Sequence, residues 1–202
     1  QAGRKDEAKQ TFDLLLARMD SPAALQEVLQ LAPQLGLGQD LTQRLGFLLD
    51  WHIVGPFPWK MSEGFSVEGI DAATPALDAA LSLAGKSAPW REVHSADALG
   101  IVNLASEFGM VDQSRAYAFT TIDSPQATDA ELRLGSDDGI AAWLNGEKVF
   151  ENNVDRPLAP DQDQAPIKLK QGKNALLLEI TQGAGGWMFC ARLTTPDGKP
   201  LQ

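Results

Sequence analysis

The stretch that decides the fold reads Glu131-Leu132-Arg133-Leu134-Gly135-Ser136-Asp137-Asp138-Gly139-Ile140-Ala141-Ala142-Trp143-Leu144-Asn145-Gly146. Apolar residues alternate at Leu132 and Leu134, and again from Ile140 to Leu144, as in antiparallel strands that pack one face on a core. A tight acidic loop separates the two runs, and Asn145-Gly146 supplies the two positive-φ residues of a type I′ hairpin turn. The stretch therefore predicts a strand, a loop, a second strand and a hairpin within one antiparallel sheet.

Similar short strand patterns continue on both sides of this stretch, separated by turn residues. Residues 60–95 lack periodicity, so we expect a long connection there that is either functional or wrapped on the sheets, with one helical turn near 77–83. Because no helices separate the other strands, the pattern favours a mainly β fold with two antiparallel sheets. The expected strands are 48–54, 100–104, 115–122, 130–135, 140–145, 147–150, 167–170, 175–181 and 187–194.

The first 47 residues have a different pattern. Phe12, Leu15, Leu16 and Met19 recur at helical spacing, and Ser21-Pro22 is typical of a helix start. We therefore divide the chain into a short α-helical segment at 1–47 and a β-sandwich at 48–202. The helices are expected either to end a helical-repeat array or to form a lid. A chain that begins at Gln rather than Met is expected to be a piece of a longer protein.

Composition narrows the possible partners. The formal net charge is −10 and the pI is about 4.6, so nucleic acid and anionic membranes would be repelled, whereas a divalent cation or a neutral polar ligand would not. No apolar run is long enough to span a bilayer, which excludes membrane insertion by a helix. A single cysteine, Cys190, excludes an internal disulfide.

The order of several motifs resembles the galactose-binding-domain-like jelly rolls that accompany bacterial glycoside hydrolases and occur in large bacterial envelope proteins. The resemblance covers about residues 48–195 and implies a jelly-roll β-sandwich without catalysis. The motifs are Trp51-His52-Ile53-Val54-Gly55-Pro56-Phe57, Ala116-Tyr117-Ala118, Ser136-Asp137-Asp138-Gly139, Trp143-Leu144-Asn145-Gly146, Leu169-Lys170-Gln171-Gly172-Lys173-Asn174 and Gly186-Trp187.

The Asp-Asp-Gly and Asn-Gly stretch also resembles the PA14 family of sugar-binding sandwiches. That resemblance implies that Asp137 and Asp138 are calcium ligands, with calcium in turn binding sugar hydroxyls. The alternative is that both carboxylates accept backbone N–H bonds in a tight turn. Since calcium takes six to eight oxygens, Asp155, Asp161 and Asp163 are candidates for the remaining ligands, provided that their loop folds back. Otherwise that loop is solvated, and Arg156 pairs with a neighbouring carboxylate.

Tryptophan is frequent in this chain, and an exposed indole is a good platform for a sugar ring. Trp187 follows a glycine-rich loop, and Trp59 and Trp90 lie in the long connection, so each is a candidate for ligand binding. Trp143 and Asn145, in the PA14-like stretch, complete the candidate ligand-binding set. The alternative for each tryptophan is a role in the core or in anchoring a loop.

Catalytic motifs fail when they are tested. The serine in Gly135-Ser136-Asp137-Asp138-Gly139 stands one place too early for a nucleophile elbow. Two isolated histidines make no metal site by spacing. We therefore expect a non-catalytic carbohydrate-binding or envelope-interaction module of a larger bacterial protein that is secreted, periplasmic or at the cell surface. Its expected partners are a glycan or a cell-envelope component, and other domains of the parent protein. The alternative is a structural or protein-interaction spacer without a sugar ligand.

Overall fold

The computed structural model describes residues 40–201, so the helices expected at 1–39 lie outside the described residues. Three short helices are present in the described part: α3 (Asp40–Arg44), η2 (Met61–Glu63) and α4 (Leu104–Phe108). None of them exceeds five residues, and a membrane span takes about 20. The strands are β1 (Asp50–Pro58), β2 (Leu81–Leu83), β3 (Lys86–Ala88), β4 (Arg91–His94), β5 (Val102–Asn103), β6 (Ser114–Ser124), β7 (Thr128–Asp137), β8 (Ile140–Leu144), β9 (Glu147–Asn152), β10 (Asp163–Leu169), β11 (Gly172–Gln182) and β12 (Met188–Thr194).

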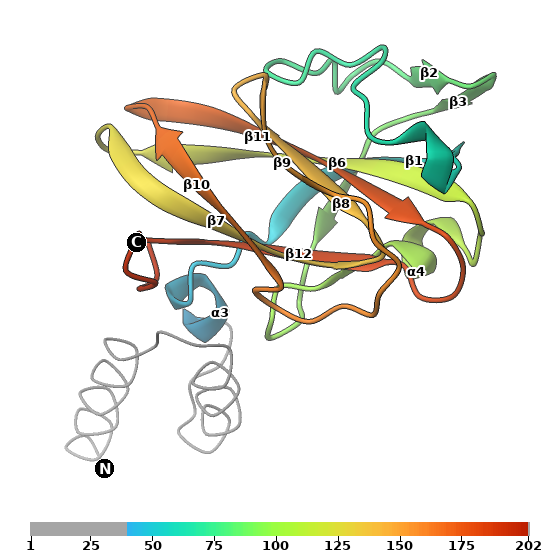
Figure 1. Cartoon of the computed structure of the whole chain (residues 1–202). Coiled ribbons are helices and arrows are strands. Elements are labelled where there is room, and N and C mark those ends of the chain that lie inside the picture. Colours follow the sequence, from blue (N-terminus) through green and yellow to red (C-terminus); the bar gives the residue numbers. More distant parts are fainter. Residues whose placement is uncertain (1–39, 202) are drawn as a thin grey trace.

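The strands form two facing antiparallel sheets (Figure 1). One sheet has six strands in the order β4-β1-β6-β11-β8-β9, and the other has four in the order β10-β7-β12-β5. The mainly β, two-sheet antiparallel sandwich predicted from the sequence is confirmed. The inner core between the sheets comes from alternate residues of both, including Trp51, Leu132, Leu134, Leu178 and Phe189.

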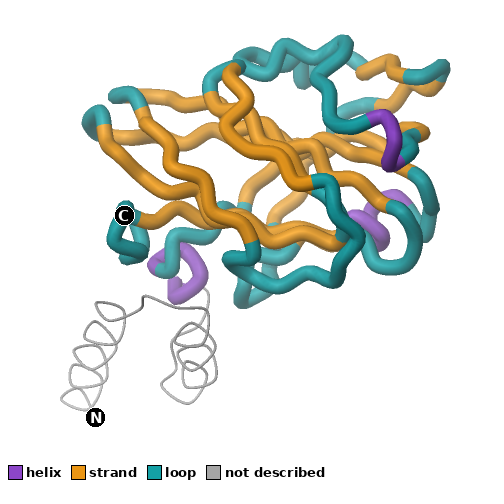
Figure 2. Tube along the Cα trace, viewed as in Figure 1, coloured by secondary structure: helices purple, strands orange, loops and turns teal. Residues whose placement is uncertain are grey.

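The strand β8 is buried along its whole length, although its sequence alternates only weakly. Its second face is covered by the connection after β1, which runs over the outer face of the six-stranded sheet (Figure 2). The connection is therefore wrapped on the sandwich, one of the two alternatives for it, and it forms a second apolar cluster. That outer cluster comprises Val54, Phe57, Ala72, Leu81, Leu83, Ala88, Tyr117, Phe119, Ala141, Trp143, Ala175 and Leu177.

Part of this connection differs from the prediction. The helical turn expected near 77–83 is absent, and Leu81–Leu83 instead pairs with Lys86–Ala88 as a small hairpin. Ala84 and Gly85 both have positive φ, at 51° and 75°, which is the geometry of a tight hairpin turn. Leu81 and Leu83 are buried on either side of an exposed Ser82. Burial that alternates with a period of two is typical of a strand and not of a helix.

The predicted hairpin after β8 is confirmed. Asn145 and Gly146 have φ values of 52° and 89°, and they join β8 to β9. The Asn145 side chain fixes this turn on the sheet, because its Oδ1 accepts a bond from the Ala175 backbone N–H at 3.0 Å and its Nδ2 donates to Asn174 Oδ1 at 3.0 Å.

The strand β12 holds the segment that precedes the sandwich. The Leu193 backbone N–H donates to the Gly46 carbonyl at 2.9 Å, and Leu48 N–H donates to the Ala191 carbonyl at 2.9 Å. A side chain at position 46 could not fit, since its Cβ would lie 2.3 Å from the Leu193 carbonyl oxygen. Leu45 and Phe47 are buried, so these residues pack with the sandwich.

Candidate functional site

The paired aspartates lie at one rim of the sandwich, where β7 ends and turns into β8. Asp137 is the last residue of β7, and a cis peptide bond joins it to Asp138. The Ser136 hydroxyl donates to the Asp138 carbonyl at 2.6 Å, and the Asp138 N–H donates to the Thr181 carbonyl at 3.1 Å. The turn is thus fixed to the end of β11, next to the glycine-rich loop 183–186.

Asp138 has the structural role that was the alternative to metal binding. Its side chain is buried, and each carboxylate oxygen accepts one backbone N–H, from Arg156 at 3.0 Å and from Gly183 at 2.8 Å. These bonds fasten two loops to the turn. Burial nevertheless raises the pKa of Asp138, since the two N–H bonds offset only part of the cost of removing its charge from water.

Asp137 is different, because its carboxylate makes no hydrogen bond with any residue between 40 and 201. Burial raises the pKa of Asp137, and the neighbouring charges of Asp138 and Asp155 raise it further. Gly186 lies against this carboxylate, and a Cβ at that position would stand 2.6 Å from Asp137 Oδ2. The rim therefore holds several negative charges close together. The Asp137 carboxylate is unpaired, and Gly186 beside it has no side chain.

Of the three further aspartates predicted as metal ligands, Asp155 is exposed near the rim, whereas Asp161 and Asp163 are engaged elsewhere, so that prediction is wrong for these two. Asp161 is buried and pairs with Arg192 and Arg133; Arg192 Nε donates to Asp161 Oδ1 at 2.7 Å. Asp163 pairs with the Arg156 guanidinium and accepts a bond from Asn152 Nδ2 at 3.0 Å. Cationic partners satisfy both carboxylates, which leaves them unsuited to a metal ion.

The loop that contains these residues does fold back to the Asp-Asp turn, but it brings an arginine there. Arg156 Nη2 donates to Ser136 Oγ at 2.8 Å and also contacts Asp163. Between residues 40 and 201, no three His, Cys, Asp or Glu side chains are arranged to hold a metal ion. Calcium at this rim would thus have the unpaired Asp137 carboxylate as its protein ligand beside the engaged Asp138, and water or ligand hydroxyls would supply the remaining oxygens.

Three of the four tryptophans predicted to bind ligand are buried instead: Trp187 is 0% exposed, and Trp143 and Trp59 are each 3% exposed. A sugar ring could not stack on any of them, so the expectation of exposed indoles is wrong at these positions. Trp187 packs beside Phe108 of α4, with 5.7 Å between ring centroids, and Trp143 belongs to the outer cluster. The Trp59 indole donates to the Gly64 carbonyl at 2.9 Å and anchors the connection.

Two other residues predicted to bind ligand, Asn145 and Trp90, are both half-buried. Asn145 is half-buried, and both ends of its amide are engaged in the turn described above, which is a structural role. Trp90 is half-buried and lies against the outer cluster.

Sequence reasoning missed a buried charged network beneath the connection. Glu179 is fully buried on β11, accepts the Ser66 backbone N–H at 2.8 Å and pairs with Arg115 at 3.2 Å. Tyr117 adds a bond from its hydroxyl to the Ser66 carbonyl at 2.8 Å. The only signal was Glu179 itself, a charged residue inside the apolar run Leu176–Ile180.

Together, the fold and rim define an antiparallel β-sandwich domain with an acidic turn at one end. No family model matches this chain, and no curated protein matches it significantly.

Among solved structures, it is similar to the PA14 domain of the MpAFP antifreeze protein, with 14% identity, a TM-score of 0.36 and coverage of 41% of this chain and 44% of that chain. It is also similar to a PA14 sugar-binding domain from an RTX adhesin, with 21% identity, a TM-score of 0.32 and coverage of 40% and 46%. A β-glucosidase from Kluyveromyces marxianus matches with 16% identity and a TM-score of 0.45 over 73% of this chain and 16% of the enzyme.

This chain spans less than half the length of each of the three matched chains. The type of sandwich is defined by the strand order of this chain, and its function is argued from its own side chains.

Proposed function

We propose that this chain is a non-catalytic carbohydrate-binding module whose rim at Asp137 and Asp138 binds glycan through a calcium ion. The observation that carries the proposal is the Asp137 carboxylate, which lacks a protein partner in the described part of the chain and lies beside two further carboxylates. A divalent cation would relieve this repulsion. The proposal includes a setting outside the cytoplasm, where free calcium is abundant enough for a weak site.

The surroundings of the rim support an open coordination sphere. Gly183 and Gly186 face the carboxylates of Asp138 and Asp137, where a Cβ would lie 3.3 Å and 2.6 Å from the nearest carboxylate oxygen. The protein supplies fewer oxygens than calcium takes, so the vacant positions suit water and the vicinal hydroxyls of a sugar.

The direct test is calcium-dependent thermal stability and calorimetry of the full chain. Extracellular calcium modules have dissociation constants of roughly 10⁻⁴ to 10⁻³ M. At a calcium concentration about 100 times the dissociation constant, binding adds about 2.7 kcal/mol to the free energy of unfolding. We expect calcium to raise Tm, a chelator to reverse the increase, and Asp137→Asn to abolish it.

Asp129→Asn is the matched control, because Asp129 lies on the same strand and its exposed carboxylate is far from the rim turn. It should leave the calcium effect unchanged. A glycan array probed with and without chelator then tests sugar binding. If calcium changes neither Tm nor the glycan profile, the proposed function is wrong.

Protons should compete with calcium at this rim. The pKa of both Asp137 and Asp138 is raised above the ordinary value for Asp, so their charged forms are lost at a higher pH than usual when pH falls. We expect the calcium-induced increase in Tm to shrink on acidification before the ordinary titration range of Asp is reached. Calorimetric titrations at a series of pH values would measure this.

The alternative function is a spacer or protein-interaction domain without a sugar ligand. The burial of Trp59, Trp143 and Trp187 favours it, since these aromatic side chains stabilise the fold and cannot take part in recognition. Light scattering would detect self-association of the full chain. A monomer that binds calcium and glycan would contradict this alternative.

A further inference from the structure

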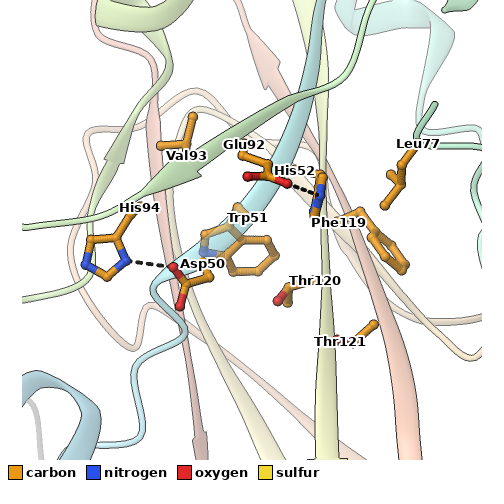
Figure 3. Close-up of a pocket in the computed structure, with 10 residues that line it drawn as sticks. All are labelled: Asp50, Trp51, His52, Leu77, Glu92, Val93, His94, Phe119, Thr120 and Thr121. Carbon is orange, nitrogen blue, oxygen red and sulfur yellow. Dashed lines mark hydrogen bonds and ion pairs between the residues drawn. The ribbon is translucent and has the colours of Figure 1, made fainter. Parts of the chain in front are cut away.

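A second polar site lies away from the Asp-Asp rim, on the outer face of the six-stranded sheet. It is a groove of about 600 Å³ formed by β1, β4 and β6, with Leu77 of the wrapped connection at one side (Figure 3). This volume is in the range of small-molecule sites. The groove lies where the connection stops covering the sheet, so the strands themselves form its floor.

Two histidine–carboxylate pairs line the groove. They follow from the register of β1 and β4, which places Asp50 opposite His94 and His52 opposite Glu92. His94 Nδ1 lies 2.7 Å from Asp50 Oδ1, and His52 Nε2 lies 3.4 Å from Glu92 Oε1. The Asp50 carboxylate orients the His94 imidazole, because only a protonated ring nitrogen can donate to it, whereas Glu92 makes only the longer contact with His52.

The second nitrogen of each ring is available to a ligand, since it has no protein partner among residues 40–201. A neutral imidazole accepts a hydrogen bond at this nitrogen, and a protonated one donates. A hydroxyl group can do either. The groove therefore suits hydroxyl groups whichever protonation state the histidines have.

The rest of the lining is apolar or carries hydroxyl groups. Phe119 of β6 lies directly opposite His52, and Thr121 follows two residues later on the same face with its side chain exposed. Leu77 and Phe119 lie beside one another beyond His52 in Figure 3, with Thr120 and Thr121 along the adjoining strand. One side of the groove thus offers apolar contact, and the other offers hydrogen bonds.

The charged side chains that line the groove indicate which class of ligand it can bind. No lysine or arginine lines the groove, so an anion would find no cationic partner there. The side chains of Asp50 and Glu92 are 79% and 87% exposed, and water screens such charges, so a cation would gain little. The remaining class is a neutral ligand that is rich in hydroxyl groups and has one apolar face, which describes a saccharide ring.

We propose that this groove is a saccharide-binding site, separate from the rim and independent of calcium. His52, His94 and Thr121 bond the ring hydroxyls, and the half-buried Leu77 contacts the apolar face, while Phe119, at 6% exposure, lies in the floor beneath them. Thr121 pairs with Ala175 of β11, whereas Ser114, at the other end of β6, pairs with Gln182 beside the rim loop. Seven residues of strand separate these positions, which is about 24 Å. A ligand in the groove therefore does not reach Asp137.

NMR titration of the isotope-labelled full chain tests the proposal. The experiment uses Asp137→Asn in the presence of a chelator, so that any calcium-dependent binding at the rim is absent and the result does not depend on the proposed function. The probes are D-glucose, D-galactose, maltose and cellobiose at roughly 10 mM, which would nearly saturate a site with a millimolar dissociation constant. We expect at least one probe to give saturable shifts at His52, Phe119 and Thr121.

Substitutions then locate the site. Thr121→Ala should weaken binding about fivefold, and His52→Ala about tenfold, as expected for the loss of one hydrogen bond. Asp123→Ala is the matched control, because Asp123 is exposed on the same face of β6 but does not line the groove, and it should have no effect. The amide spectrum of each variant shows directly whether it is folded.

Two results would overturn the proposal. One is the absence of shifts at the groove residues with all four sugars. The other is saturable binding of the cationic probe putrescine at these residues without binding of any sugar, which would identify an amine site instead.

Discussion

At the residue scale, Asp161 shows how strongly one buried carboxylate is tied to its surroundings. It accepts bonds from Arg192 and Arg133, two side chains on neighbouring strands that are themselves almost fully buried. Arg192 also donates to the Leu45 carbonyl at 3.3 Å, so the cluster links β12, β7 and the segment before β1. The attraction within such a buried pair adds little to the free energy of unfolding, because both charges are removed from water. Removing one partner costs much more, because the other charge is then buried without a partner.

Asp161→Asn should therefore destabilise the domain by about 3–5 kcal/mol, because it leaves the Arg192 guanidinium in the interior without its counter-charge, whereas Arg133 keeps its pair with Glu131. Chemical denaturation followed by circular dichroism would measure the loss in the free energy of unfolding. Asp129→Asn removes only an exposed ion pair with Lys168 and should change it little. Equal effects of the two substitutions would show that the buried pairing is unimportant.

The same residue explains why sequence reasoning could not separate structural aspartates from candidate metal ligands. The pairs that engage Asp161 join residues 28 and 31 positions apart, and nothing in the local pattern distinguishes an aspartate that will meet two arginines from one that will meet a cation. Asp137 and Asp138 could be selected because the turn that holds them is encoded in adjacent residues. Even so, which of the two carboxylates stays unpaired depends on Gly183 and Arg156, which are distant in sequence.

At the scale of elements, the connection after β1 is held on the sheet by Glu179. Burial raises the pKa of Glu179 to about 7 from the ordinary value of 4.5, against the opposing effects of the Ser66 N–H and Arg115. Between pH 4.5 and 7 the folded chain then binds more protons at this group than the unfolded chain does. The free energy of unfolding should consequently fall as pH rises through this window.

Glu179→Gln should remove that part of the pH dependence, since the amide does not titrate. Urea denaturation at several pH values between 4 and 8 would show a smaller decline for the variant than for the parent. Glu147→Gln, at an exposed position on β9, is the control and should preserve the parental slope. If the variant and the parent have identical slopes, Glu179 does not ionise in this range.

Asn174 joins two turns near the opposite end of β11. Its side chain is fully buried and bonds Lys170 N–H at 2.9 Å, the Lys170 carbonyl at 2.9 Å and Asn145 Nδ2 at 3.0 Å. The β8–β9 turn and the β10–β11 turn are thus held by one amide. The sequence of each turn predicted that turn, but it did not predict that Asn174 joins the two.

Asn174→Ala should cost roughly 2–4 kcal/mol, because several backbone and amide groups lose their partner in a buried site. Asn153→Ala removes a single exposed bond to the Met61 carbonyl and should cost about 1 kcal/mol or less. Thermal or urea unfolding of both variants would test the difference. A similar small loss for both would mean that water replaces the Asn174 bonds without cost.

At the scale of the whole molecule, the alternation of apolar residues was enough to predict the sandwich, since it specifies which face of each strand is buried. It was not enough to place the tryptophans. Trp143 is on the outer face of its sheet, where a two-layer sandwich would expose it, and it is buried only because residues from the connection form a third layer. That layer has little periodicity of its own, so its position depends on contacts such as Ser66 with Glu179.

The attachment of both flanking segments to β12 has a mechanical consequence. Gly46 accepts from the Leu193 N–H, and Leu201 N–H donates to the Leu193 carbonyl at 3.0 Å, so the two attachments meet at one residue. Tension applied through positions 46 and 201 would act on these few bonds in succession and would not shear the long ladders all at once. Optical-tweezer stretching with handles at those positions should give an early, low-force extension as β12 peels away. Rupture of the entire domain in one high-force step would show that the load is shared across both sheets.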